Sequence, residues 1–127
     1  MVHEQFPAPV GANVTVLRGR LNRPAEERLL PSGERVAEFE VRIPPHLTSA
    51  RVETVNVVWP DAKTDIASLG VDDEVVVVGR VRRRFFRSGG LTQSRTEVVA
   101  DTVCPVRRGR QVANIIEAAT KRLSEVR

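Results

Sequence analysis

Tyrosine is absent from the chain, and tryptophan, cysteine and histidine are nearly so. The one cysteine, Cys104, excludes an internal disulfide, and its place before Pro105 in a valine-rich run predicts a buried thiol. His3 and His46 could not complete a metal shell around it, nor a Ser/His/Asp or Cys/His catalytic arrangement. No glycine-rich phosphate loop lies between a strand and a helix. We therefore expect a protein without catalytic activity, metal or cofactor.

Long hydrophobic runs are missing as well. No apolar stretch reaches 18 residues, so no transmembrane helix and no membrane partner are expected. The N-terminal segment MVHEQFPAPVGAN has neither the basic start nor the apolar centre of a signal peptide. These absences predict a soluble protein of the cytoplasm.

The excess of positive charge lies entirely in the C-terminal part of the chain. Residues 1–106 carry 14 basic and 14 acidic side chains, whereas residues 107–127 carry six basic and two acidic ones. Lysine occurs only at positions 63 and 121, and the other basic residues are arginines. Arginine can fork onto a phosphate or stack on a base. The local cluster therefore favours a nucleic-acid partner, with a solvated arginine-rich hairpin as the alternative; its members are Arg80, Arg82, Arg83, Arg84 and Arg87.

Valine is abundant, and its branched side chain favours pleated sheet. Alternating apolar and polar side chains predict five strands, at 13–21, 35–43, 51–59, 73–87 and 91–103. A Ser-Gly-Gly turn at 88–90 joins the last two strands into a long hairpin. Strands do not alternate with helices, which argues against a parallel sheet. The expected fold is all-β, a small closed barrel.

Two helices are expected beside the barrel. Residues 61–70, bounded by Asp61 and Gly70 as cap candidates, predict a short helix after the third strand. From residue 109 onward, apolar residues recur at helical spacing, which predicts an amphipathic C-terminal helix. We therefore divide the chain into a barrel domain at 1–106 and a basic helix at 107–127. The apolar stripe either packs on the barrel or contributes to self-association through Val112, Ile116, Ala119 and Leu123.

Three segments resemble the bacterial single-stranded DNA-binding protein (SSB) family, in that family's order and spacing. They are NVTVLRGRLNRPAEERLLPSGERVAEFEV at 13–41, GVDDEVVVVGRVRRRFF at 70–86 and TEVVAD at 96–101. The resemblance covers about residues 11–103 and implies a five-stranded OB-fold barrel that binds single-stranded DNA without regard to sequence. It also implies a homo-oligomer, a tetramer or a dimer, associated with the nucleoid and active in DNA replication, repair and recombination.

Sequence-tolerant binding of a single strand requires a basic groove for phosphates and aromatic faces for bases. The resemblance places Phe86 where the family has a stacking tryptophan in this hairpin, and Trp59 where it has an aromatic residue late in the third strand. The side chains that we expect to bind single-stranded DNA are Arg20, Arg42, Trp59, Arg82, Arg84, Phe86, Arg87 and Arg95.

The chain departs from the family pattern in two places. A short segment, PPHLTSA at 44–50, stands where the family has a long hairpin with a stacking aromatic residue. The chain ends in the basic TKRLSEVR rather than in an acidic tip with a terminal phenylalanine. We therefore expect a short paralogue that does not recruit repair enzymes through such a tip. Two alternatives stay open, an OB-fold replisome accessory that mainly contacts proteins and a binder of RNA or structured nucleic acid.

Overall fold

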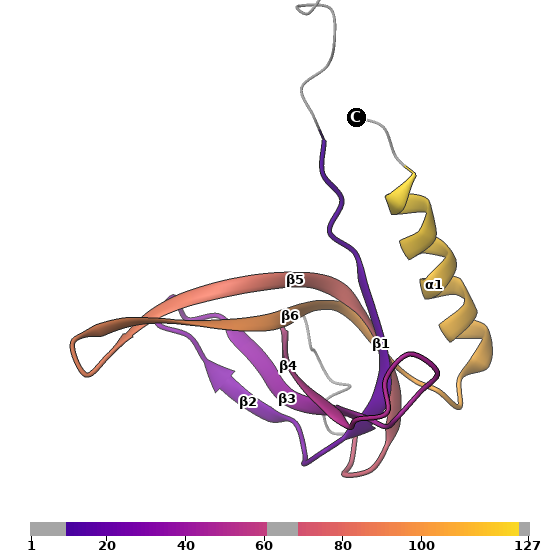
Figure 1. Ribbon diagram of the computed structural model, residues 1–127, viewed down its shortest axis with the longest axis horizontal. Helices are drawn as coiled ribbons and strands as arrows, with labels where there is room; N and C mark the ends of the chain where they lie inside the picture. Colours follow the sequence, from indigo (N-terminus) through magenta and orange to yellow (C-terminus); the bar gives the residue numbers. More distant parts are fainter. Residues whose placement is uncertain (1–9, 61–68, 125–127) are drawn as a thin grey trace, which may run out of the picture.

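The computed structural model describes residues 10–60 and 69–124 of the chain. Strands dominate, and one helix follows them near the C-terminus (Figure 1). The strands are β1 (Thr15–Leu21), β2 (Glu26–Leu29), β3 (Arg35–Ile43), β4 (Glu53–Trp59), β5 (Glu74–Ser88) and β6 (Leu91–Pro105). The helix α1 (Gly109–Leu123) is the amphipathic C-terminal helix that the sequence predicts.

All six strands belong to one sheet, in the order β1-β5-β6-β4-β3-β2. Strand β1 pairs along most of its length with β5, and its last two residues, Arg20 and Leu21, pair with β3. The pairings of β1, β5, β6, β4 and β3 therefore form a closed circuit. All of them are antiparallel except the short parallel pairing of β4 with β6.

The sixth strand, β2, corrects the expectation of five. Its residues lie between Pro24 and Pro31, outside the five predicted strands, yet they pair in register with the first half of β3. The turn between the two strands contains Gly33, whose φ of +90° favours glycine. Without β2, the first half of β3 would be an edge of the sheet with unpaired backbone groups. Such an edge can be paired even by a polar segment of four residues.

The core is built from inward-pointing side chains of β1, β3, β4, β5 and β6, which alternate along most of each strand with side chains that point outward. Val75 and Val77 point inward from β5, whereas Val76 and Val78 belong to a second apolar cluster beneath α1. Burying a valine side chain stabilises the fold by about 1.5–3 kcal/mol, so both faces of this part of β5 contribute. The main cluster also contains both large rings of β3 and β4, Phe39 and Trp59.

Strands β5 and β6 form a hairpin with two distinct halves. Near the circuit both strands are buried, whereas from about Arg80 to Thr96 most side chains are exposed and the hairpin projects away from the sheet (Figure 1). The register shifts where the halves meet, because Val78 pairs with Thr102 but Gly79 pairs with Ala100. A Cβ atom on Gly79 would lie 2.1 Å from the carbonyl oxygen of Val99, so only glycine fits at this bulge.

Helix α1 packs against the outer side of β5 and β6. Val112, Ile115 and Ala119 contact the cluster of Val76 and Val78. The apolar stripe expected for self-association is therefore split. Its member Ala119 is buried against its own chain and is corrected to a packing residue, and Val112 packs there too. Only Ile116 and Leu123 remain open, at 38% and 56% exposure.

The predicted short helix at 61–70 falls almost entirely outside the described residues. Leu69, next to that gap, is buried in the main core cluster. In the described part of the chain, no helix is long and apolar enough to span a membrane.

Candidate nucleic-acid interface

The projecting half of the β5–β6 hairpin has two faces, which strand alternation and register define. One face, called here the Glu97 face, carries Arg82, Arg84 and Phe86 from β5 opposite Glu97, Arg95 and Gln93 from β6. The other, called here the Phe85 face, carries Arg83, Phe85 and Arg87 opposite Thr96, Ser94 and Thr92. Alternation alone separates the arginine cluster of the sequence into these two sets.

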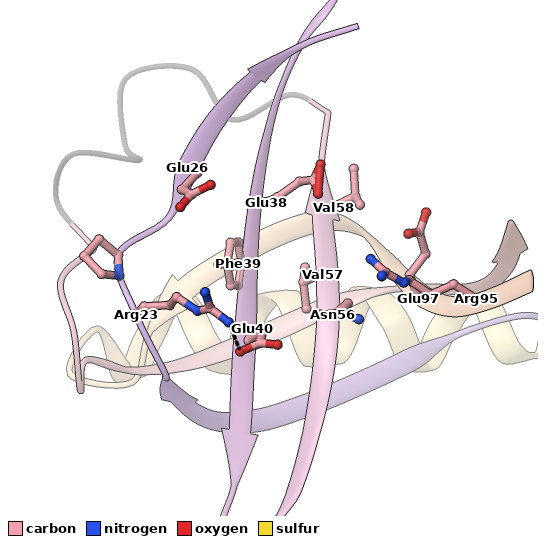
Figure 2. Close-up of a pocket in the computed structure, with 11 residues that line it drawn as sticks. Arg23, Glu26, Glu38, Phe39, Glu40, Asn56, Val57, Val58, Arg95 and Glu97 are labelled. Atoms are coloured by element: carbon pink, nitrogen blue, oxygen red, sulfur yellow. Dashed lines mark hydrogen bonds and ion pairs between the residues drawn. The ribbon is translucent and has the colours of Figure 1, made fainter. Parts of the chain in front are cut away.

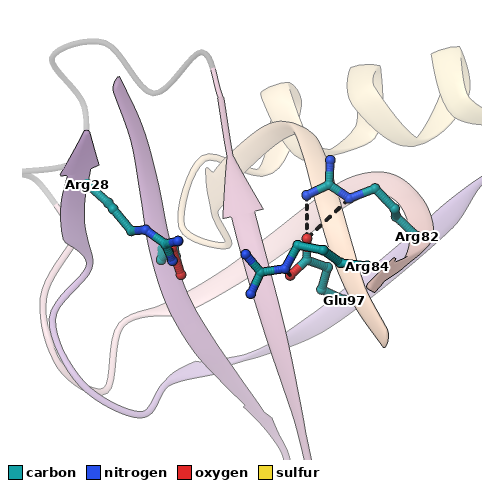
Figure 3. A network of polar contacts seen from close by, with 5 residues as sticks. Arg28, Arg82, Arg84 and Glu97 are labelled. Carbon is teal, nitrogen blue, oxygen red and sulfur yellow. Dashed lines mark hydrogen bonds and ion pairs between the residues drawn. The ribbon is translucent and has the colours of Figure 1, made fainter. Parts of the chain in front are cut away.

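A buried carboxylate organises the Glu97 face. Glu97 is 2% exposed, and the guanidinium of Arg82 donates from both Nε, at 3.2 Å, and Nη2 to its Oε2. Nε of Arg84 lies 3.7 Å from the other carboxylate oxygen, Oε1. Figure 3 shows both arginines converging on Glu97. One negative charge is therefore shared by two positive ones, which leaves the trio with a net charge of about +1.

Arg84 also touches the ring of this face. Its Cζ lies 5.6 Å from the centroid of the Phe86 ring, within cation–π range. Its Nε is buried without a hydrogen-bond acceptor, so the guanidinium is held by charge and by the ring rather than by a full set of hydrogen bonds. Phe86 itself is half-buried. The arrangement places a planar cation beside an aromatic ring, which suits a base and its phosphate.

A pocket of about 310 Å³ lies next to the Glu97 face. It opens across β2, β3, β4 and β6, with Phe39 and Val57 in its lining (Figure 2). Its rim is charged in both signs, since the lining includes Arg23, Glu26, Glu38, Glu40, Arg95 and Glu97. The groove is therefore polar and wide open rather than an apolar cavity for a small ligand.

Most of the acidic charge in the pocket is compensated. Glu40 accepts hydrogen bonds from Asn22 Nδ2 at 3.1 Å and from Arg23 Nη2 at 3.2 Å. The Asn22 bond, and after it the Arg23 bond, hold the pKa of Glu40 below its usual range. Glu38 pairs with Arg28 of β2. Arg95 makes no ion pair within the described residues, so it is the basic group of the lining that is available to a phosphate.

Two of the predicted binding residues lie away from the hairpin. Arg20 and Arg42 are direct partners where β1 meets β3, and Arg42 shares the outer face of β3 with Glu38 and Glu40. Arg20 Nη1 donates to the carbonyl oxygen of Asp72 at 3.0 Å. Both extend the outer surface of β3, but neither lines the pocket.

One of the binding expectations needs correction. Trp59 is 7% exposed and belongs to the main core cluster, because it has the same parity in β4 as the buried Val57. It presents no open ring to a base. Arg87 does not lie with Arg84 and Phe86, since it belongs to the Phe85 face, where its Nη2 donates to the Gly90 carbonyl oxygen at 3.0 Å.

The structure also brings in residues that the sequence reasoning did not select. Arg23 lines the pocket just before β2, and Arg28 of β2 pairs with the lining residue Glu38; the sequence did not reveal that β2 adds to the sheet. Glu97 was visible in the segment TEVVAD, but its burial beside two arginines depends on register. Phe85 was available from the alternation, as the ring on the opposite face from Phe86.

Metal and thiol chemistry are not supported in the described ranges. No group of three or more His, Cys, Asp or Glu side chains there could hold a metal ion. Cys104 is buried, as the sequence predicts, and this burial raises the pKa of its thiol. Such a thiol is a packing residue rather than a nucleophile.

The comparisons with known proteins rest on structure. No protein-family model matches the chain, and no curated protein matches it in sequence. Among solved structures, the chain is similar to a Plasmodium falciparum SSB in a complex with single-stranded DNA, with a TM-score of 0.61 and 20% identity. The match covers 74% of this chain and 90% of the other. The chain therefore has an SSB-like OB-fold.

Proposed function

We propose that this protein binds single-stranded DNA without regard to sequence, through the Glu97 face of the hairpin and the adjoining outer surface of β3, β4 and β6. One observation carries the proposal, namely the Arg84 guanidinium over the Phe86 ring, directly opposite Arg95, which lines the open groove. Base stacking and phosphate contact are the two elements of sequence-tolerant binding, and side chains suited to each lie side by side on this OB-fold.

The proposal extends to the setting of that activity. The protein acts by binding alone, without catalysis, as a short relative of the bacterial SSB family that protects single strands in replication, repair or recombination. It works as a homo-oligomer in the cytoplasm. The segment resemblance at 13–41, 70–86 and 96–101 supports this setting, as does the fold shared with an SSB that was solved with single-stranded DNA.

A titration with fluorescent oligo-dT at two salt concentrations tests the proposal. Since phosphate contacts release counterions, affinity should fall by about tenfold or more between 50 and 200 mM salt. Replacing Phe86 with Ala should weaken binding by about 1–3 kcal/mol if a base stacks there. Arg95→Ala should weaken binding and flatten the salt dependence, whereas Arg110→Ala, with the same loss of charge on exposed α1, should do neither. Absence of binding in low salt would refute the proposal.

One observation favours a second candidate function, a module that mainly contacts proteins. The pocket lining contains four carboxylates, Glu26, Glu38, Glu40 and Glu97, which suit a basic partner segment better than a phosphate backbone. The same titration separates the two functions, because a protein-contact module would bind oligo-dT negligibly at physiological salt.

A further inference from the structure

The Phe85 face of the hairpin carries an exposed aromatic ring between two arginines. Phe85 is 65% exposed, which makes it far more accessible than the half-buried Phe86 on the other face. Arg83 and Arg87 flank it at positions two residues before and two residues after, on the same face. Across the ribbon lie the hydroxyl side chains of Thr92, Ser94 and Thr96.

The electrostatics of the two faces differ. On the Glu97 face, Arg82 and Arg84 share a buried carboxylate that a phosphate would have to compete with. None of the six residues of the Phe85 face is acidic, and Arg83 makes no ion pair with any other described residue. Arg87 donates one hydrogen bond to a backbone carbonyl, which leaves its charge uncompensated. The two faces therefore carry the same net charge, about +2, but only on the Phe85 face is no arginine neutralised by a carboxylate.

These features match one ligand chemistry. A polyanion alone would need the arginines but not the ring, and an apolar protein surface would need the ring but not two uncompensated cations beside it. A single-stranded nucleic acid uses both, because its bases stack on aromatic rings while its phosphates pair with arginine. The hydroxyls opposite can add hydrogen bonds to phosphate or sugar oxygens.

We propose that the Phe85 face is a second contact site for single-stranded DNA, so that the hairpin holds one strand segment on each of its two faces. This inference rests on the proposed function of the Glu97 face. The two sites lie on opposite sides of a two-stranded ribbon, so a segment on one face cannot touch the other. A long strand reaches both by passing around the hairpin, and two short strands occupy them independently.

The number of short oligonucleotides bound per chain tests the inference. With dT oligomers of about eight nucleotides, within the span of a single OB-fold site, native mass spectrometry should find two per wild-type chain at saturation. At the lowest oligonucleotide concentration that saturates the wild-type chain, Phe85→Ala and Phe86→Ala should each leave one site largely empty, so that about one oligonucleotide is bound, and the double variant should leave both sites largely empty. Phe85→Leu keeps an apolar side chain without a stacking ring, and it should behave like Phe85→Ala.

The outcomes separate the inference from the function it rests on. One oligonucleotide per wild-type chain, with Phe85→Ala unchanged, would overturn the second site and leave the proposed function intact. No oligonucleotide on the wild-type chain would overturn both. If Phe85→Ala altered the oligomeric mass while Phe85→Leu and the DNA stoichiometry stayed as in the wild type, the face would be a protein contact and the inference would be wrong. The circular dichroism spectrum of each variant verifies that it folds.

Discussion

At the scale of single residues, Glu97 has the largest influence on the charge of the candidate interface. It is almost fully buried, yet it lies directly opposite Arg82 and diagonally opposite Arg84 on an exposed hairpin. Its carboxylate orients both guanidinium groups and at the same time reduces the positive charge that they present. A phosphate arriving at this face therefore encounters positioned but partly neutralised arginines.

Replacing Glu97 with Gln should strengthen binding of single-stranded DNA. The amide keeps the shape of the side chain but removes the charge, so Arg82 and Arg84 become available to phosphates. We expect the slope of log affinity against log salt to steepen by about 0.7 for each additional phosphate that the protein neutralises, and the free energy of unfolding to fall by about 1.5–3 kcal/mol because a buried, hydrogen-bonded charge is lost. Anisotropy titrations at several salt concentrations measure the slope. Glu117→Gln on exposed α1 changes net charge equally, and an equal increase in affinity for that control would contradict the prediction.

At the scale of elements, the hairpin and the helix each depend on one small residue. Gly79 allows β5 to pass against the backbone of β6 at the bulge, and Ala119 allows α1 to lie close to β5. In both places a larger side chain has no room, because backbone or core valines occupy the space. Small residues at close contacts of this kind are sensitive positions in a structure.

Gly79→Ala should destabilise the fold and disturb the hairpin. Its Cβ would lie 2.1 Å from the Val99 carbonyl oxygen and 2.9 Å from Ala100 Cα, so the backbone of one strand must move. We expect a loss of about 1–3 kcal/mol in the free energy of unfolding, measured by urea denaturation. Gly11→Ala is the matched control, since its Cβ would meet nothing within 4 Å. Equal stability of the two variants would show that the bulge tolerates a side chain.

Ala119→Arg should loosen α1 from the sheet, whereas Ala118→Arg should not. Ala119 is buried against the cluster of Val76 and Val78, and its neighbour Ala118 is exposed. We expect the Ala119 variant to lose about 1–3 kcal/mol and to show faster amide exchange in α1. Hydrogen exchange of the two variants, followed by mass spectrometry, makes the comparison. Similar exchange in both would contradict the packing described here.

Strands and helices whose apolar residues recur at a regular spacing could be predicted from the sequence. Elements that form only by pairing with a distant strand could not. The alternation in RVAEFEVRI and in the hairpin led to the correct strands, and the 3–4 spacing after residue 109 led to α1. The pairing of β2 was missed because its sequence, EERL, has no apolar alternation and becomes a strand only beside β3. Trp59 was assigned to binding because the family resemblance has an aromatic residue at that position, although its parity with Val57 in β4 directs it into the core.

At the scale of the whole molecule, ion pairs join strands that are distant in sequence. Arg18 of β1 donates to Glu74 of β5 at 3.0 Å, and Arg23 links the segment after β1 to Glu40 of β3. The Arg18 hydrogen bond lowers the pKa of Glu74, and the Asn22 and Arg23 bonds lower that of Glu40. Both carboxylates are therefore more readily ionised in the folded chain than in the unfolded chain.

Stability should consequently decline in acid. A carboxylate whose folded pKa lies below its unfolded value of about 4.3 contributes stability above that value and loses it as the pH falls through the folded pKa. We expect urea midpoints to be level from pH 7 to about 5 and to drop below about 4. Each pair is partly exposed, so Glu74→Gln should remove only about 0.2–1 kcal/mol at pH 7, and it should make the acid decline shallower. An identical pH profile for wild type and variant would exclude this pair as a cause.

The position of the bulge at Gly79 also determines how the hairpin transmits force. The hairpin beyond Val81 is about 25 Å long, clamped at one end by the closed circuit of strands and free at the turn, which makes it a cantilever. A pull at the turn therefore produces its largest bending moment at the clamp. There Asp101 Oδ1 lies 3.8 Å from Arg80 Nη1 of the hairpin, and Asp101 Oδ2 lies 3.1 Å from Arg122 Nη1 of α1. Helix α1 therefore supports the hairpin at its clamped end. Tension on a strand held by the hairpin would thus be carried into α1.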